Sequence, residues 1–81
     1  MNENTFIQNL MAFRKHALDE GAYYNENGFL IYKGKILTRA DTEYLAQSDE
    51  PFNRLLDESE IKALFDNLLD YAFEYEVGDD E

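Results

Sequence analysis

The sequence predicts an α+β fold in a single acidic domain over residues 1–77, followed by a short acidic tail at 78–81 that is expected to be frayed. Segments near both ends have apolar residues at intervals of three and four, which is typical of amphipathic helices. Between them, two apolar runs are joined by Lys33 and Gly34, as in a β-hairpin. A chain of 81 residues buries roughly 60–65% of its unfolded surface, which is enough for one core. The expected order is an N-terminal helix, a hairpin or three-stranded antiparallel sheet, two short helices and a long C-terminal helix.

The first helix is expected to begin at Asn4 or Thr5 and to end at Gly21. Thr5 and Gln8 have capping-box spacing, and glycine commonly follows the last turn of a helix. His16 is the only histidine, and no second imidazole or nucleophile is near it in the sequence, so an exposed helix residue is favoured over a catalytic base. The expected buried side consists of apolar residues, namely Phe6, Ile7, Leu10, Met11, Phe13, Ala17 and Leu18.

The hairpin is expected to pair residues 29–32 with residues 35–38. A two-residue turn places Ile31 opposite Ile36 and Leu30 opposite Leu37. A second turn signal at 25–28 makes residues 22–24 the candidate for a third strand. Because side chains alternate along a strand, the two faces are expected to hold Phe29, Ile31, Ile36 and Thr38 on one side and Leu30, Tyr32, Lys35 and Leu37 on the other.

Three helices are expected after the hairpin. The first begins at Thr38, and Pro51 suits the first turn of a second, short helix because its missing N–H would be unpaired there. The third is expected over residues 57–77, where Asp57 and Glu60 have capping-box spacing. Its buried stripe is expected to hold Ile61, Leu64, Phe65, Leu68, Leu69, Ala72 and Tyr75, and its outward stripe Glu58, Lys62, Asp66, Asp70 and Glu74.

The formal net charge of −11 is unevenly distributed along the chain. Residues 1–40 carry a net charge of +1, whereas residues 41–81 carry fourteen acids and two bases, a net charge of −12. Such a field repels nucleic acid and anionic lipid, so no direct nucleic acid binding and no membrane contact are expected. It attracts basic surfaces, with a strong dependence on salt.

Catalytic, cofactor and metal sites are not expected. Two carboxyl groups act as acid and base when burial or a second carboxylate nearby keeps one of them protonated. Carboxylates on a solvent-facing stripe are not in such an environment. A calcium loop around Gly28 is rejected, because Tyr23 and Gly34 would occupy its first and last ligand positions. The chain has no cysteine, no signal-peptide pattern and no long apolar run, which favours a cytoplasmic protein.

The function favoured by the sequence is stoichiometric inhibition of a basic, nucleic-acid-binding protein by a DNA-mimicking decoy. Helix residues four apart lie about 6 Å apart along the axis, and phosphates on one DNA strand repeat every ~3.4 Å of axis, so an acidic stripe can imitate part of a backbone. In size and charge the chain resembles small acidic inhibitors of restriction enzymes, CRISPR effectors and repair glycosylases, often encoded by phages and mobile elements. The expected partner-binding residues are Glu58, Asp66, Asp70, Glu74, Glu76, Asp79 and Asp80.

Two alternatives remain open from the sequence. In one, the chain is a small adaptor or regulatory subunit, or a homodimer, that docks through its hairpin and tyrosines, because tyrosine is enriched in interface cores. In the other, the acidic stripe is only a solvated helix face and the charge serves solubility. The residues expected for docking in the first alternative are Tyr23, Tyr24, Leu30, Tyr32 and Leu37.

Overall fold

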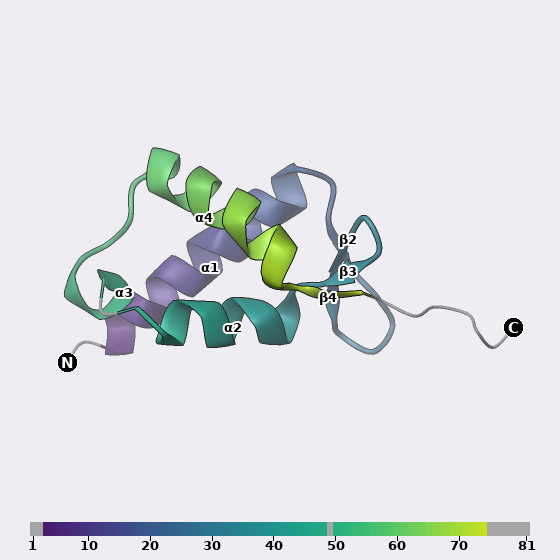
Figure 1. The fold of residues 1–81 in the computed structure, drawn as a ribbon, viewed down its shortest axis with the longest axis horizontal. Coiled ribbons are helices and arrows are strands. Elements are labelled where there is room, and N and C mark those ends of the chain that lie inside the picture. Colours follow the sequence, from purple (N-terminus) through teal and green to yellow (C-terminus); the bar gives the residue numbers. More distant parts are fainter. Residues whose placement is uncertain (1–2, 49, 75–81) are drawn as a thin grey trace, which may run out of the picture.

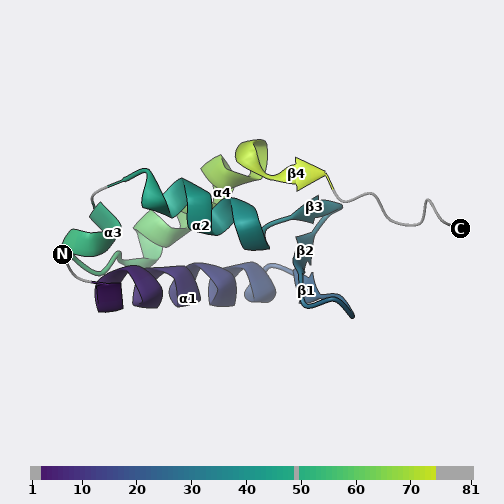
Figure 2. The ribbon, with the colours of Figure 1, turned by 90° about the horizontal axis from the view of Figure 1, so that it is seen from below.

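The computed structural model describes residues 3–48 and 50–74, and it confirms the α+β prediction. Helices α1, α2 and α4 lie side by side, α3 lies near one end of this layer, and a small sheet lies at the other end (Figures 1 and 2). The sheet is antiparallel with the order β1-β2-β3-β4. The elements are α1 (Glu3–Asp19), β1 (Tyr23–Tyr24), β2 (Leu30–Tyr32), β3 (Lys35–Ile36), α2 (Thr38–Ala46), α3 (Glu50–Asn53), α4 (Glu58–Tyr71) and β4 (Phe73–Glu74).

The hairpin of β2 and β3 has the predicted register. Ile31 lies opposite Ile36, and the N–H of Leu37 donates to the carbonyl of Leu30 at 2.8 Å. Lys33 has φ 48° and Gly34 has φ 79°, the two left-handed residues of a turn whose twist matches that of the strands. The candidate third strand is present as β1, which pairs with β2.

The long C-terminal helix was predicted to extend to residue 77, and this prediction is wrong. Helix α4 ends at Tyr71, Ala72 is extended with φ −72° and ψ 150°, and Phe73 then pairs with Ile36 in β3. The physical reason is the free edge of β3, whose backbone groups gain hydrogen-bond partners when the chain leaves the helix. Glu74 therefore lies on strand β4, opposite Lys35, and not on the outward stripe of the helix.

The core lies between the helices and one face of the sheet. Leu30, Tyr32 and Leu37 of the sheet face this core and are buried. The ring of Phe65 in α4 lies at its centre, 5.7 Å from the Phe13 ring and 5.0 Å from the Tyr32 ring between centroids. Aromatic pairs at such separations add to the free energy gained by burying apolar area.

The buried side of α1 differs from the predicted one. It follows Thr5, Asn9, Phe13 and Ala17 at four-residue intervals, all of which are buried. Asn9 is tolerated there because its amide is fully hydrogen-bonded to the segment around α3. Of the residues predicted to be buried, Phe13 and Ala17 are in the core, Phe6 and Leu10 are half-buried, and Ile7, Met11 and Leu18 are exposed.

Most of the predicted helix ends agree with the structure. Gly21, with φ +112°, follows α1, Pro51 lies in the first turn of α3, and Asp57 and Glu60 form the predicted capping box of α4. Helix α2 begins at Thr38 as predicted, with Leu37 in the N-cap position, and the Thr38 hydroxyl oxygen accepts the N–H of Leu30 at 2.5 Å. None of the helices in the described part of the chain is both long and apolar enough to cross a membrane.

Candidate functional site

The outward side of α4 carries three carboxylates, those of Glu58, Asp66 and Asp70, which we call the acidic face. All three side chains are exposed. Lys62 lies among them, yet no ion pair within residues 3–48 and 50–74 joins it to Glu58 or Asp66. Glu74 is exposed on β4, and the remaining predicted partner-binding residues Glu76, Asp79 and Asp80 lie outside the described residues. The acidic face therefore has fewer carboxylates than the predicted stripe, and ion pairs with neighbouring residues do not neutralise its charge.

The arginines of the described chain are engaged with other carboxylates. Arg39 pairs with Glu43 at 3.8 Å on the surface of α2. Arg14 donates from Nε and Nη2 to the buried carboxylate of Asp41, at 2.6 and 2.8 Å, and these hydrogen bonds raise its pKa above the ordinary arginine value. No local pattern in the sequence marks Asp41 as the partner of Arg14, 27 positions away. These pairs leave the acidic face without an arginine counter-charge.

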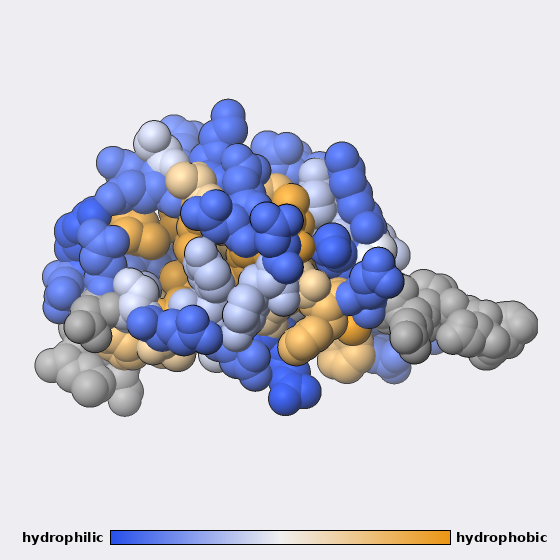
Figure 3. Space-filling view, viewed as in Figure 1, coloured by the Kyte–Doolittle hydropathy of each residue, from blue (hydrophilic) through white to orange (hydrophobic). Residues whose placement is uncertain are grey.

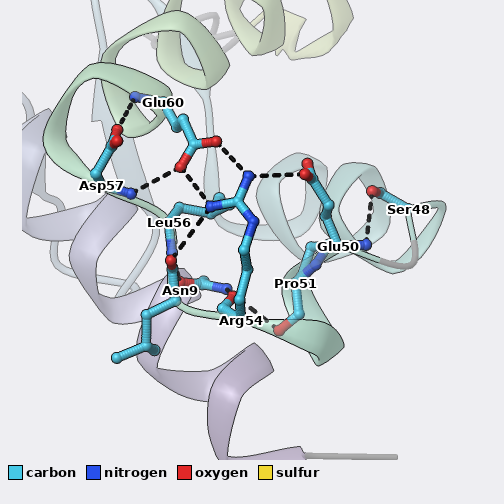
Figure 4. A network of polar contacts seen from close by, with 9 residues as sticks. Asn9, Ser48, Glu50, Pro51, Arg54, Leu56, Asp57 and Glu60 are labelled. Atoms are coloured by element: carbon cyan, nitrogen blue, oxygen red, sulfur yellow. Dashed lines mark hydrogen bonds and ion pairs between the residues drawn. The ribbon is translucent and has the colours of Figure 1, made fainter.

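Arg54 forms the third pair, beside the start of α4 (Figure 4). Its guanidinium donates to both oxygens of the Glu60 carboxylate, one of them at 2.7 Å. It also donates to one oxygen of the Glu50 carboxylate at 2.8 Å. The hydrogen bonds from Arg54, followed by the one from the N–H of Asp57, lower the pKa of Glu60 to about 2. Glu60 therefore remains ionised throughout the neutral range, and the pKa of Arg54 is raised in turn.

Asn9 fixes this region to α1 (Figure 4). Its amide nitrogen donates to the carbonyls of Pro51 and Arg54 at 3.2 and 3.1 Å, and its amide oxygen accepts the N–H of Leu56 at 2.9 Å. The side chain is 1% exposed. Asn9 thus holds α3 and the segment leading to α4 in place, which sets the position of Glu50 relative to Glu60.

A groove of about 480 Å³ runs between α2, α3 and α4. Hydrophobic residues are recessed between hydrophilic ones in the area between α4 and α2 (Figure 3). Two lining residues of the groove contact Tyr71 of α4: the amide of Gln47 donates to the Tyr71 hydroxyl at 3.1 Å, and the ring of Tyr44 lies 5.4 Å from the Tyr71 ring between centroids. Its apolar lining consists of Leu45, Pro51, Leu56, Ala63 and Leu64, and its polar lining of Tyr44, Gln47, Ser48, Glu50, Glu60 and Asn67.

The docking face predicted on the hairpin is wrong in three of its five residues. Leu30, Tyr32 and Leu37 are buried because their side of the sheet packs on the helices. Tyr23 and Tyr24 are exposed, at 52% and 49%. The sequence could not decide which face of the hairpin is covered, since both faces carry apolar side chains.

The opposite side of the sheet carries several exposed aromatic residues, and we call it the outer sheet face. Cross-strand partners share a face, so Tyr23, Ile31, Ile36 and Phe73 form one row across the four strands. Phe73 is 49% exposed, and Phe29, next to this row, is 43% exposed. Phe29, Ile36 and Phe73 are therefore candidate docking residues that the sequence did not indicate. The strand alternation could have suggested Phe29 and Ile36, whereas Phe73 depends on β4.

His16 and the carboxylates are the groups of this chain with the chemistry for metal binding or acid–base catalysis. His16 was predicted to be exposed, but its side chain is half-buried, 5.1 Å from the Phe65 ring centroid and 3.8 Å from the carboxylate of Glu20. Among the residues that the structure describes, no group of three or more histidine, aspartate or glutamate side chains converges in a way that would hold a metal ion.

Neither the models of protein families, nor the curated proteins, nor the solved structures contain a match to this chain. The features that bear on function are therefore the acidic face, the groove and the outer sheet face.

Proposed function

We propose that the protein is a stoichiometric inhibitor that occupies the basic nucleic-acid-binding surface of another protein. The observation that carries this proposal is the acidic face of α4, where Asp66 and Asp70 are exposed one turn apart and have no ion-pair partner among the described residues. A rigid helix holds its carboxylates at fixed positions, so a basic surface can bind them without ordering a flexible segment first. The protein is in this account a decoy for nucleic acid, and it binds no nucleic acid itself.

The charge balance supports the same function. Like charges four residues apart on a helix cost roughly 0.2–0.5 kcal/mol per pair, and Asp66 and Asp70 are such a pair. Residues 41–81 carry a net charge of −12, which creates a field that speeds encounter with a cationic surface. The repulsion within α4 is thus a cost to stability that recognition of a basic partner would offset.

The proposal predicts the behaviour of a variant with Asp66→Asn and Asp70→Asn in affinity capture. Wild-type protein immobilised on beads is expected to capture a nucleic-acid-binding protein from a lysate and to release it at moderate salt. A charge at the solvent-exposed edge of an interface contributes up to about 1 kcal/mol to the binding free energy. Because the variant removes two such charges, it is expected to bind roughly three- to thirtyfold more weakly. The measurement is the dissociation constant of the captured protein at low and moderate salt, after its identification by mass spectrometry.

The matched control is a variant with Asp19→Asn and Glu26→Gln, which removes two exposed carboxylates elsewhere and changes the net charge by the same amount. This control is expected to bind like wild type. Equal binding of all three proteins at both salt concentrations would contradict the proposal, because the acidic face would then contribute nothing to recognition.

A second function, an adaptor that docks through the outer sheet face, is favoured by one observation. Tyr23, Phe29 and Phe73 are between 43% and 52% exposed around a row that includes the buried Ile31. Large aromatic side chains are enriched at interface cores. In the same capture experiment, binding that persists at moderate salt and is lost on Tyr23→Ser with Phe73→Ser would assign the partner to this face instead.

A further inference from the structure

The groove between α2, α3 and α4 has an apolar floor and an acidic end. Leu45 and Pro51 are buried, and Leu56 and Leu64 are half-buried, so the floor is made of side chains held by the rest of the fold. The carboxylates of Glu50 and Glu60 lie at the end next to α3. We infer that this groove receives a long basic side chain, arginine or lysine, of the partner protein. The inference rests on the proposed function and adds the feature by which the partner is recognised.

The shape of the groove suits such a side chain. Arginine and lysine have a stem of three or four methylene groups and a charged head, and they favour sites where the stem lies on apolar surface while the head reaches polar groups. A volume of about 480 Å³ is within the range of pockets that hold small ligands, which leaves room for one long side chain and the backbone beside it. Burial of the stem would add a contribution to binding that salt does not screen.

The charges of the groove favour a cation as its occupant. Glu50 and Glu60 share the single guanidinium of Arg54, so this end keeps a net charge of −1. The acidic residues that line the groove are Glu50 and Glu60; Asp66 and Asp70 are not among its lining residues, although Asn67, next to Asp66 in the sequence, is. Arg54 also shows that a guanidinium is accommodated between these two carboxylates.

A second copy of the chain is not a suitable occupant. Two molecules with a net charge of −11 each repel one another, and the rim of the groove is acidic in both. The complementary partner is a basic protein, which is also the class of partner that the acidic face requires.

The test uses N-acetyl-arginine amide as the probe, titrated into the full protein and followed by amide chemical shifts in nitrogen–proton NMR spectra. The expected result is saturable shifts of Ala63, Leu64 and Asn67, which line the groove. N-acetyl-citrulline amide has nearly the same shape without the charge. It is expected to bind about two- to fivefold more weakly, because a partly exposed ion pair contributes little to the binding free energy. Glu50→Gln is expected to weaken arginine binding by a similar factor, with little change for citrulline.

The most decisive variant is one in which a new side chain fills the groove. Ala63 is exposed and lines the groove, so Ala63→Phe should occupy the groove without entering the core and should abolish the shifts. Ala12→Phe places the same side chain on an exposed position of α1, away from the groove, and should retain them. Folding of each variant is checked by its amide spectrum in the absence of probe.

Amide shifts that persist in Ala63→Phe, amide shifts spread evenly over all acidic residues, or equal binding of the arginine and citrulline probes would each overturn the inference. Because the probe requires no partner protein, its failure is distinguishable from failure of the proposed function. A partner captured through Asp66 and Asp70 that binds Ala63→Phe as well as wild type would leave the inhibitor proposal intact and the groove without a role.

Discussion

Replacement of Asp41 by alanine is expected to lower the free energy of unfolding by about 3 kcal/mol. The Asp41 side chain has no exposed area, and its carboxylate accepts hydrogen bonds from Nε and Nη2 of Arg14. Removal of the buried Asp41 leaves the guanidinium of Arg14, whose side chain is 25% exposed, without its carboxylate partner, which costs more than the pair itself contributes. Nη2 of Arg14 would keep only its bond to the carbonyl of Thr38 and its contact with Thr42. Chemical denaturation monitored by circular dichroism measures this loss.

The control is Glu43→Ala on the same helix. Glu43 pairs with Arg39 at 3.8 Å on the surface, and such pairs contribute little, so the expected change is within about 0.5 kcal/mol. The double variant Arg14→Met with Asp41→Leu is expected to recover a large part of the stability, because it removes both charges together. A loss below about 1 kcal/mol for Asp41→Ala would contradict the assignment of this pair as the buried link between α1 and α2.

Replacement of Asn9 by alanine is expected to cost about 2–3 kcal/mol. The variant would leave the N–H of Leu56 and the carbonyls of Pro51 and Arg54 without the partner that Asn9 supplies, and unsatisfied buried groups are costly. For a chain of 81 residues, total stability is roughly 4–12 kcal/mol, so the loss is a large fraction of it. Thermal and denaturant unfolding give the measurement.

Gln8→Ala is the matched control for Asn9, since Gln8 is an exposed neighbour on the same helix. Its expected effect is within about 0.5 kcal/mol. If Asn9→Ala were as stable as Gln8→Ala, the segment around α3 would be held by contacts other than the amide of Asn9.

Local signals in the sequence predicted the parts of the fold that local chemistry determines. The turn at Lys33 and Gly34 set the hairpin register, and the spacing of Asp57 and Glu60 marked the start of α4. Strand β4 was missed because Ala72 and Tyr75 continue the helical periodicity in the sequence, and only the free edge of β3, distant in sequence, favours a strand there. Asn9 and Asp41 were missed for a related reason, since their partners lie 27 to 47 positions away.

The candidate site was predicted in part. The exposure of Asp66 and Asp70 follows from helical periodicity, and the structure agrees with it. The choice between the two faces of the hairpin depends on where the helices pack, and both faces are apolar, so the sequence could not separate Leu30 from Ile31 by pattern alone. The groove was not predicted at all, because it is formed by residues from three helices that are brought together only by the fold.

The central claim is that the protein and nucleic acid compete for one surface of the target. The most direct test is fluorescence anisotropy of a labelled duplex bound to the captured target, with increasing concentrations of the acidic protein. The account predicts that the wild-type protein displaces the duplex at one equivalent, and that the Asp66→Asn with Asp70→Asn variant requires a higher concentration. A ternary complex, in which the target retains its duplex while the protein is bound, would contradict the account.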